Sequence, residues 1–251
     1  MAESALKRQP QAGEHHHPQG VVPHHRDVQG GAARAAVFGI SDGLLTNISL
    51  ILGVSGASTS PSVVRLAGLA GLVAGAFSMA AGEYVSVSAQ SELLQREVDV
   101  ERREIERHPE AETRELATVF RRRGVDDADA QRLAAAIMKD PEVALEVHTR
   151  EELGFSPGRT GSPRQAALSS FVTFAVGAVI PLLPWFFTGG TLAVGISIAL
   201  GFVSVFAVGW TVAVFTGRSR MRSAVRQLFF AAVAASVAYG VGRLVGVSGV
   251  V

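Results

Sequence analysis

The chain has 251 residues, of which 48% are hydrophobic and only 18% are charged, and its formal net charge is +1 at pH 7. Soluble domains usually carry about a quarter charged residues, so this composition favours a membrane protein. The near-neutral charge indicates no particular partner, no nucleic-acid-binding motif is present, and the lack of cysteine excludes disulfides, thiolate metal sites and cysteine nucleophiles.

The first 30 residues are polar and contain five histidines. These are His15, His16, His17, His24 and His25. The stretch lacks the apolar segment of a signal peptide, and its composition predicts a disordered cytosolic tail. Loose metal binding by the histidines is one interpretation, but a solvated low-complexity tail is the commoner meaning of such a sequence.

Five apolar segments follow, each long enough to cross a bilayer. They cover residues 34–57, 64–90, 166–187, 190–216 and 225–247. The second continues into a charged helical stretch without a breaker until His108 and Pro109, which predicts one long helix that leaves the membrane. The predicted fold class is an all-α polytopic membrane protein with five transmembrane helices.

A charged region between the second and third spans predicts a small cytosolic helical domain. Pro109 and Pro141 suit the first turns of two helices, and Gly124 and Gly154 suit helix ends. The predicted organisation is a tail (1–30), two spans (31–91), a cytosolic metal-binding domain with its linker (92–164) and three spans (165–251).

Arginine placement predicts the orientation. The link between the fourth and fifth spans carries Arg218, Arg220, Arg222 and Arg226, whereas the links at 58–63 and 188–190 are uncharged. The positive-inside rule therefore places the N-terminus, the 92–164 region and the 218–226 link in the cytosol, and the C-terminus outside. Abundant arginine, alanine and glycine are typical of GC-rich bacterial genomes, so we expect the bacterial cell (inner) membrane.

Two acidic residues lie well inside the apolar spans, Asp42 in the first and Glu83 in the second. A carboxylate at a helix centre costs about 2.5–3.5 kcal/mol on the insertion scale, so it is seldom kept without a function. The structural alternatives are that Asp42 pairs with an arginine such as Arg34, and that Glu83 lies near the lipid headgroups.

Each acid shares a helical face with small or polar residues. The two faces are Asp42, Thr46, Ser49 and Gly53, and Gly71, Gly75, Met79 and Glu83. Together they predict a water-accessible path in which the Met79 sulfur joins carboxylate oxygens, a ligand mixture that favours Fe²⁺ and its late neighbours over Mg²⁺ or Ca²⁺. The glycines and small residues at spacing four fit either a dimer seam on the second span or ordinary packing within one subunit.

The predicted domain contains paired carboxylates at a spacing of three, which point to one face of a helix. The candidate metal ligands are Glu101, Glu104, Glu112, Glu115, His148 and Glu152. If the pairs converged, their mutual repulsion would require cations between them. Because arginines are interleaved with them, a charge-laced solvated helix is the competing interpretation.

Several motifs resemble those of the vacuolar iron transporter family over nearly the whole chain after residue 24. The motifs are Arg34-Ala-Ala-Val-Phe-Gly, Ser41-Asp42-Gly43-Leu44, Ser78-Met79-Ala80-Ala81-Gly82-Glu83-Tyr84-Val85-Ser86, Glu151-Glu152-Leu153-Gly154, Val176-Gly177-Ala178 and Ile180-Pro181-Leu182. The resemblance implies a five-span homodimer that moves Fe²⁺, and often Mn²⁺ or related ions, out of the cytosol in exchange for protons. It implies a translocation path at the positions of Asp42 and Met79, and metal binding by the five domain glutamates.

Two departures from the family pattern leave the metal preference open. Plant members carry a further glutamate where Gly71 stands and methionines near His148 and Thr149. Glu83 and His148 are the candidates to replace them, and imidazole suits Mn²⁺, Fe²⁺, Co²⁺ and Zn²⁺ alike.

The sequence therefore predicts a proton-coupled Fe²⁺/Mn²⁺ transporter with a transport path of Asp42, Met79 and Glu83 and with no permanently bound cofactor. The main alternative is a membrane-anchored iron sensor or store that uses the glutamate cluster, and a second is a proton-coupled transporter of another solute. An enzyme is not expected, because no nucleophile or catalytic constellation is present.

Overall fold

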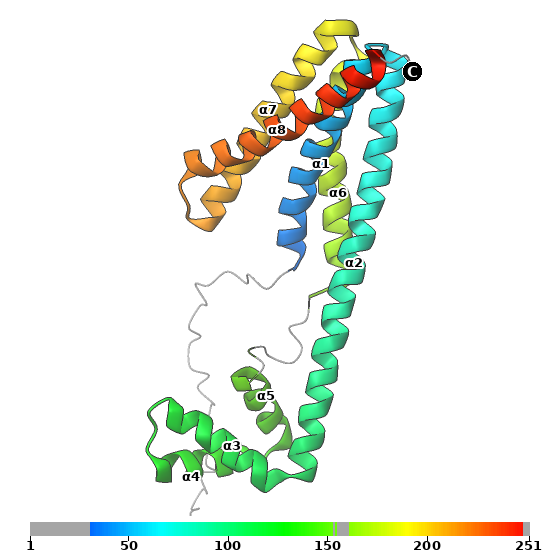
Figure 1. Ribbon diagram of the computed structural model, residues 1–251. Coiled ribbons are helices and arrows are strands. Elements are labelled where there is room, and N and C mark those ends of the chain that lie inside the picture. The colour runs from blue at the N-terminus through cyan, green and yellow to red at the C-terminus, as the bar shows by residue number, and fades with distance from the viewer. Residues whose placement is uncertain (1–30, 153, 155–160, 248–251) are drawn as a thin grey trace, which may run out of the picture.

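The computed structural model describes residues 31–152, 154 and 161–247, and every regular element in these residues is a helix (Figure 1). The helices are α1 (Gly31–Ala57), α2 (Pro61–Arg107), α3 (Pro109–Arg122), α4 (Asp127–Ile137), α5 (Pro141–Glu152), α6 (Pro163–Leu182), the 3₁₀ helix η1 (Leu183–Phe186), α7 (Gly190–Thr216) and α8 (Arg220–Val247). The predicted histidine-containing tail, most of the predicted linker and the last four residues lie outside the described residues.

Five helices in the described part of the chain are long and apolar enough to cross a membrane. They are α1, α2, α6 with η1, α7 and α8. Large apolar side chains such as Leu66, Phe77 and Val237 are exposed on them. Such a surface is unfavourable in water but is the expected outer surface in lipid. The all-α, five-span prediction therefore agrees with the structure.

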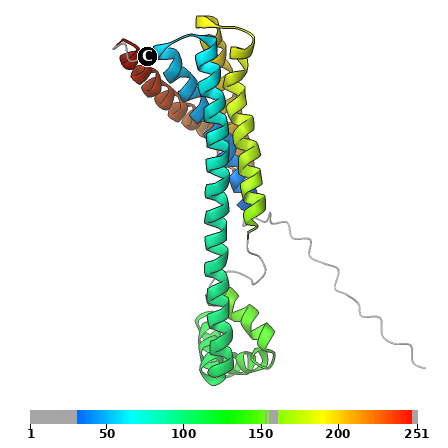
Figure 2. The same ribbon diagram turned by 90° about the vertical axis from the view of Figure 1, so that its right-hand side faces the viewer.

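The second span and the charged stretch after it form one helix. α2 contains 47 residues, which gives a length of about 70 Å, whereas the hydrocarbon core of a bilayer is about 30 Å thick. It ends at Arg107, and His108 lies outside the helix because Pro109 begins a new helix with a different direction. Figures 1 and 2 show its lower half extending beyond the bundle and carrying α3, α4 and α5.

The bundle is built around α1, which packs against α6, α8, α2 and α7. Glycine allows the closest of these approaches: a Cβ on Gly43 would overlap the carbonyl oxygen of Phe174 in α6. Gly71 and Gly75 of α2 likewise face Leu50 and the Phe174 ring. Within the single chain these two glycines therefore pack against α1 and α6, and a dimer seam on this face of α2 stays a prediction.

α3, α4 and α5 form a small domain with its own apolar contacts. Val98 and Ile105 of α2 pack against Ala144 and Leu145 of α5, and a second cluster joins α3 to α4. Gly124 adopts a left-handed conformation (φ +92°) between α3 and α4, as its predicted position at a helix end requires. These contacts hold α5 beside the extramembrane half of α2. The side of the membrane on which the domain lies stays a prediction.

Candidate functional site

The helical domain brings four potential metal ligands together from three helices. They are Glu101, Glu112, His148 and Glu152, and one ligand atom from each lies within 4.8 Å of all the others. Glu101 lies on α2 and Glu112 in the first turn of α3, so the bend at His108 places both at one corner. The two α5 ligands are four residues apart and therefore share a face of that helix.

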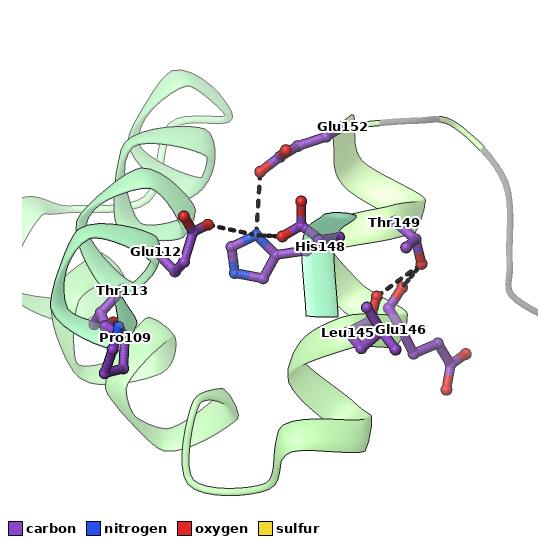
Figure 3. A network of polar contacts seen from close by, with 9 residues as sticks. Pro109, Glu112, Thr113, Leu145, Glu146, His148, Thr149 and Glu152 are labelled. Atoms are coloured by element: carbon purple, nitrogen blue, oxygen red, sulfur yellow. Dashed lines mark hydrogen bonds and ion pairs between the residues drawn. The ribbon is translucent and has the colours of Figure 1, made fainter. Parts of the chain in front are cut away.

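The His148 side chain is fully buried, and its Nδ1 atom is the centre of the cluster. Nδ1 lies 3.1 Å from Oε1 of Glu101, 3.6 Å from Oε2 of Glu112 and 3.1 Å from Oε1 of Glu152. Figure 3 shows Glu112 and Glu152 pointing at the imidazole ring from two different helices. Three carboxylates thus converge on one nitrogen atom.

The environment shifts the proton affinity of three members of this cluster. Burial, followed by the nearby Glu101 carboxylate, raises the pKa of Glu112 and of Glu152. Burial acts to lower the pKa of His148, but the adjacent carboxylates of Glu101 and Glu152 outweigh it and the pKa is raised. The cluster therefore holds protons more tightly than isolated side chains do, and a bound cation would have to displace them.

Hydrogen bonding within the described residues leaves part of the cluster unsatisfied. Nδ1–H of His148 can donate to Glu152, and the buried Oε1 of Glu101, also 3.1 Å from Nδ1, has no other hydrogen-bond partner in this part of the chain. Nε2 of His148 is also buried without a described partner. Three carboxylates around one imidazole nitrogen repel one another, and a bound cation would relieve this repulsion. Carboxylate and imidazole ligands suit Fe²⁺, Mn²⁺, Co²⁺ and Zn²⁺.

Two of the predicted ligands, Glu104 and Glu115, lie outside the group of four. Residues three apart on an α-helix differ in direction by about 60°, so only one member of each predicted pair points into the cluster. Glu104 lies 3.9 Å from His108 instead. Glu115 is exposed, although its charge contributes to raising the pKa of Glu112 and Glu152. Their roles as ligands stay predictions.

A second polar site lies among the spans, where residues of α1, α2 and α6 line a cavity of about 310 Å³ that is open on one side in the single chain. The predicted path residues Asp42, Met79 and Glu83 all line it. Asp42 is exposed in the single chain and accepts a hydrogen bond from Thr46 (3.2 Å), whereas Met79 is partly buried beside Phe174. The cavity therefore combines two carboxylates with one thioether sulfur.

Arg34 also lines this cavity, and it pairs with Glu83 rather than with Asp42. Its Nη2 atom lies 3.1 Å from Oε2 of Glu83, whose side chain is only 11% exposed. The structural alternative that paired Arg34 with Asp42 is therefore wrong. Arg34 on α1 and Glu83 on α2 face each other where these two helices pack together, so the ion pair joins the two helices.

Asn47 is a polar residue of the spans that the sequence analysis did not single out. It is buried, and its Nδ2 atom donates a hydrogen bond to the carbonyl oxygen of Ala178 at 2.5 Å. Its Oδ1 atom is buried without a hydrogen-bond partner among the described residues, close to Gly71. A polar amide side chain in an otherwise apolar segment is the sequence feature that could have pointed to Asn47.

The candidate spans and the carboxylate–histidine cluster define a multi-pass membrane protein with the ligands of a cation site. A sequence profile narrows this class: the profile of the VIT family matches residues 33–243. The chain belongs to the VIT family, whose members are transporters and not enzymes. The family resemblance of the motifs is thereby confirmed.

Curated relatives cover most of the chain. "Vacuolar iron transporter 1" of Arabidopsis thaliana is 31% identical over 231 residues, which are 90% of this chain and 92% of the relative. "Vacuolar iron transporter 1" of rice is 31% identical over 232 residues, 92% of this chain and 90% of the relative. "Vacuolar iron transporter" of Acanthamoeba castellanii is 36% identical over 222 residues, 85% of this chain and 78% of the relative.

Proposed function

We propose that this protein transports divalent transition metals, Fe²⁺ or Mn²⁺ and with them Co²⁺ or Zn²⁺, out of the cytosol in exchange for protons. The observation that carries the proposal is that α2 contributes to two polar sites. Its extramembrane half supplies Glu101 to the carboxylate–histidine cluster, and its membrane half supplies Met79 and Glu83 to the cavity. The names of the relatives, which refer to iron transport, support the same substrate class.

In the proposed cycle, the cluster around His148 collects the ion and passes it to the cavity at Asp42 and Met79. The ligand set of three carboxylates and one imidazole supports the first step because it suits divalent ions of this series. Two carboxylates facing one cavity can carry either a divalent cation or protons, which is the chemical basis of the exchange. Arg34 competes with the ion for Glu83 and so limits how tightly the cavity holds it.

Orientation and assembly belong to the same proposal. Consecutive spans run in opposite directions. The beginning of α1, the helical domain and the turn between α7 and α8 therefore lie on the same side of the bundle (Figure 1). The arginines of that turn support a cytosolic location for this side and an outer C-terminus. A homodimer is proposed because Asp42 is exposed in the single chain and a second copy would shield it from lipid. The bacterial cell membrane is proposed from composition, whereas the relatives' names refer to a vacuole.

Purified full-length protein in liposomes, with a metal-sensitive dye inside, tests the proposal. Metal flux should depend on an imposed pH gradient and should disappear in Asp42→Ala. Asp99→Ala is the matched control, because Asp99 also lies on a span-forming helix but outside both sites. Flux that survives in Asp42→Ala would refute the path, and metal binding without flux under any gradient would favour the anchored sensor or store.

A further inference from the structure

The turn between α7 and α8 contains a cluster of arginines that the proposed transport does not use. α7 ends at Thr216, Gly217 adopts a left-handed conformation (φ +65°), and α8 begins at Arg220. Arg222 and Arg226 lie four residues apart at the start of α8, and Arg218 precedes the helix in the turn. This spacing places Arg222 and Arg226 on one face of α8, one turn apart.

These three arginines line a pocket of about 400 Å³. The hydroxyl-bearing residues Thr216, Ser219 and Ser223 line it as well. No carboxylate of the described residues lies within 4 Å of these guanidinium groups, and the sequence contains no Asp or Glu after Glu152. The pocket thus has a positive charge that no acidic residue in this half of the chain neutralises.

We propose that this pocket binds a phosphate group at the membrane surface. Arginine presents a planar fork of donors that matches phosphate oxygens, and the hydroxyl groups of Ser219 and Ser223 can add further donors, whereas Thr216 donates to the carbonyl oxygen of Val212. The first turn of α8 contributes backbone N–H groups without helical acceptors and the positive end of a helix dipole. The pocket therefore combines three arginines and two serines with the start of a helix, which is the chemistry that such an anion requires.

Neighbouring residues place the pocket at the level of the lipid headgroups. The Arg220 guanidinium lies over the ring of Trp210, 5.8 Å from its centroid. Tryptophan is enriched where the bilayer meets water. Basic pockets between membrane helices on the cytosolic side are typical sites for anionic lipid headgroups, although inorganic phosphate offers the same chemistry.

The competing explanation is that the arginines only set membrane orientation. Orientation depends on the number of positive charges near the spans and does not require a pocket. Lysine in place of arginine keeps that charge but loses the bidentate fork. The two explanations therefore differ in what Arg222→Lys does to binding.

The test titrates full-length protein in neutral detergent with phosphatidylglycerol, phosphatidylcholine and inorganic phosphate, and counts bound molecules by native mass spectrometry. Arg222→Gln and Arg222→Lys are compared with Arg220→Gln, a matched control that removes an arginine outside the pocket lining. We expect saturable binding of phosphatidylglycerol over phosphatidylcholine. It should be about tenfold weaker in Arg222→Gln, clearly weaker in Arg222→Lys and unchanged in Arg220→Gln.

The results also distinguish the source of the phosphate. Binding of phosphatidylglycerol that inorganic phosphate does not displace assigns the pocket to a lipid headgroup, and displacement assigns it to phosphate itself. Absence of saturable binding of either ligand overturns the proposal. So does an equal loss in Arg222→Gln and Arg220→Gln, because bulk charge would then explain the binding.

Discussion

Nδ1 of His148 lies 3.1 Å from Oε1 of Glu101, which joins α5 directly to the helix that forms the second span. Met79 lies on the same unbroken helix, at a distance of about 33 Å along its axis for a rise of about 1.5 Å per residue. The cluster and the cavity are therefore linked by one continuous helix rather than by a loop.

Removing one cluster ligand should weaken metal binding. Glu101→Gln keeps the size of the side chain but removes one of the charges that would face the ion, so we expect Mn²⁺ affinity to fall by at least about tenfold. Isothermal titration of the full-length protein measures this. Glu106→Gln is the matched control, because Glu106 is exposed on the same helix outside the cluster. Equal effects of the two changes would argue against a site at Glu101.

The stability of the helical domain and its metal affinity should change in opposite directions with pH. The pKa values of Glu112, His148 and Glu152 are raised, so the folded domain without metal binds more protons than the unfolded chain. The contribution of these three groups to its stability is therefore greatest at low pH and is lost as pH rises through the raised values, which lie above 4.5 for the glutamates and above 6.5 for the histidine.

Metal must displace these protons, so affinity for Mn²⁺ should rise over the same pH window. Circular-dichroism melting curves from about pH 5 to about pH 8, with chelator and with Mn²⁺, check both signs. His148→Ala should flatten both trends because the cluster loses its central group. A melting temperature that increases with pH in chelator would contradict the expected sign.

Met79→Leu should change which metal is preferred. The substitution keeps the apolar volume of the side chain but removes the sulfur, which binds later and softer metals better than Mn²⁺. We expect flux of Fe²⁺ and Co²⁺ into liposomes to fall more than flux of Mn²⁺. Met221→Leu on α8 is the control, because Met221 is exposed and does not line the cavity. Parallel losses for all three ions would show that the sulfur does not select among them.

Releasing Glu83 from its ion pair should strengthen ion binding in the cavity. Arg34→Gln removes the guanidinium that lies 3.1 Å from Glu83, so a cation no longer competes with a fixed positive charge. The metal concentration for half-maximal flux should fall severalfold in liposomes, while Arg34→Lys should behave like the original protein. Arg65→Gln, at the other end of the second span, is the control. A higher half-maximal concentration would mean that the ion pair instead organises the site.

Gly43→Ala should destabilise the bundle, since its Cβ would overlap the backbone of Phe174 on α6. Overpacking of this kind costs about 1–3 kcal/mol, and backbone atoms cannot move aside as a flexible side chain can. Gly195→Ala is the matched control in α7, where a Cβ meets nothing within 4 Å. Thermal unfolding in detergent should show a clear loss for the first and none for the second. Equal melting temperatures would refute the close α1–α6 contact.

Much of the fold was predictable because its determinants are local. Continuous apolar runs predicted the five spans, and the lack of a helix breaker before His108 predicted the length of α2. Gly124 predicted the end of a helix. Only the ends of the spans shifted: α8 begins at Arg220, before the predicted apolar segment, because the charged turn is itself helical. A hydropathy pattern marks only the apolar part of a helix, so it misses a charged first turn that extends beyond that part.

The sequence alone was enough to identify two acids in the apolar spans and the methionine on the same helical face as one of them. It also identified a set of carboxylates and one histidine in the stretch of chain from α2 to α5. The tertiary structure decided which of them meet: Glu112 reaches His148 whereas Glu104 does not, and Arg34 pairs with Glu83 whereas Asp42 bonds Thr46. The physical reason is that composition and periodicity act within one helix, whereas a contact between helices depends on their rotation and crossing. Those follow from packing at glycines such as Gly43 and Gly75, which no local pattern reveals.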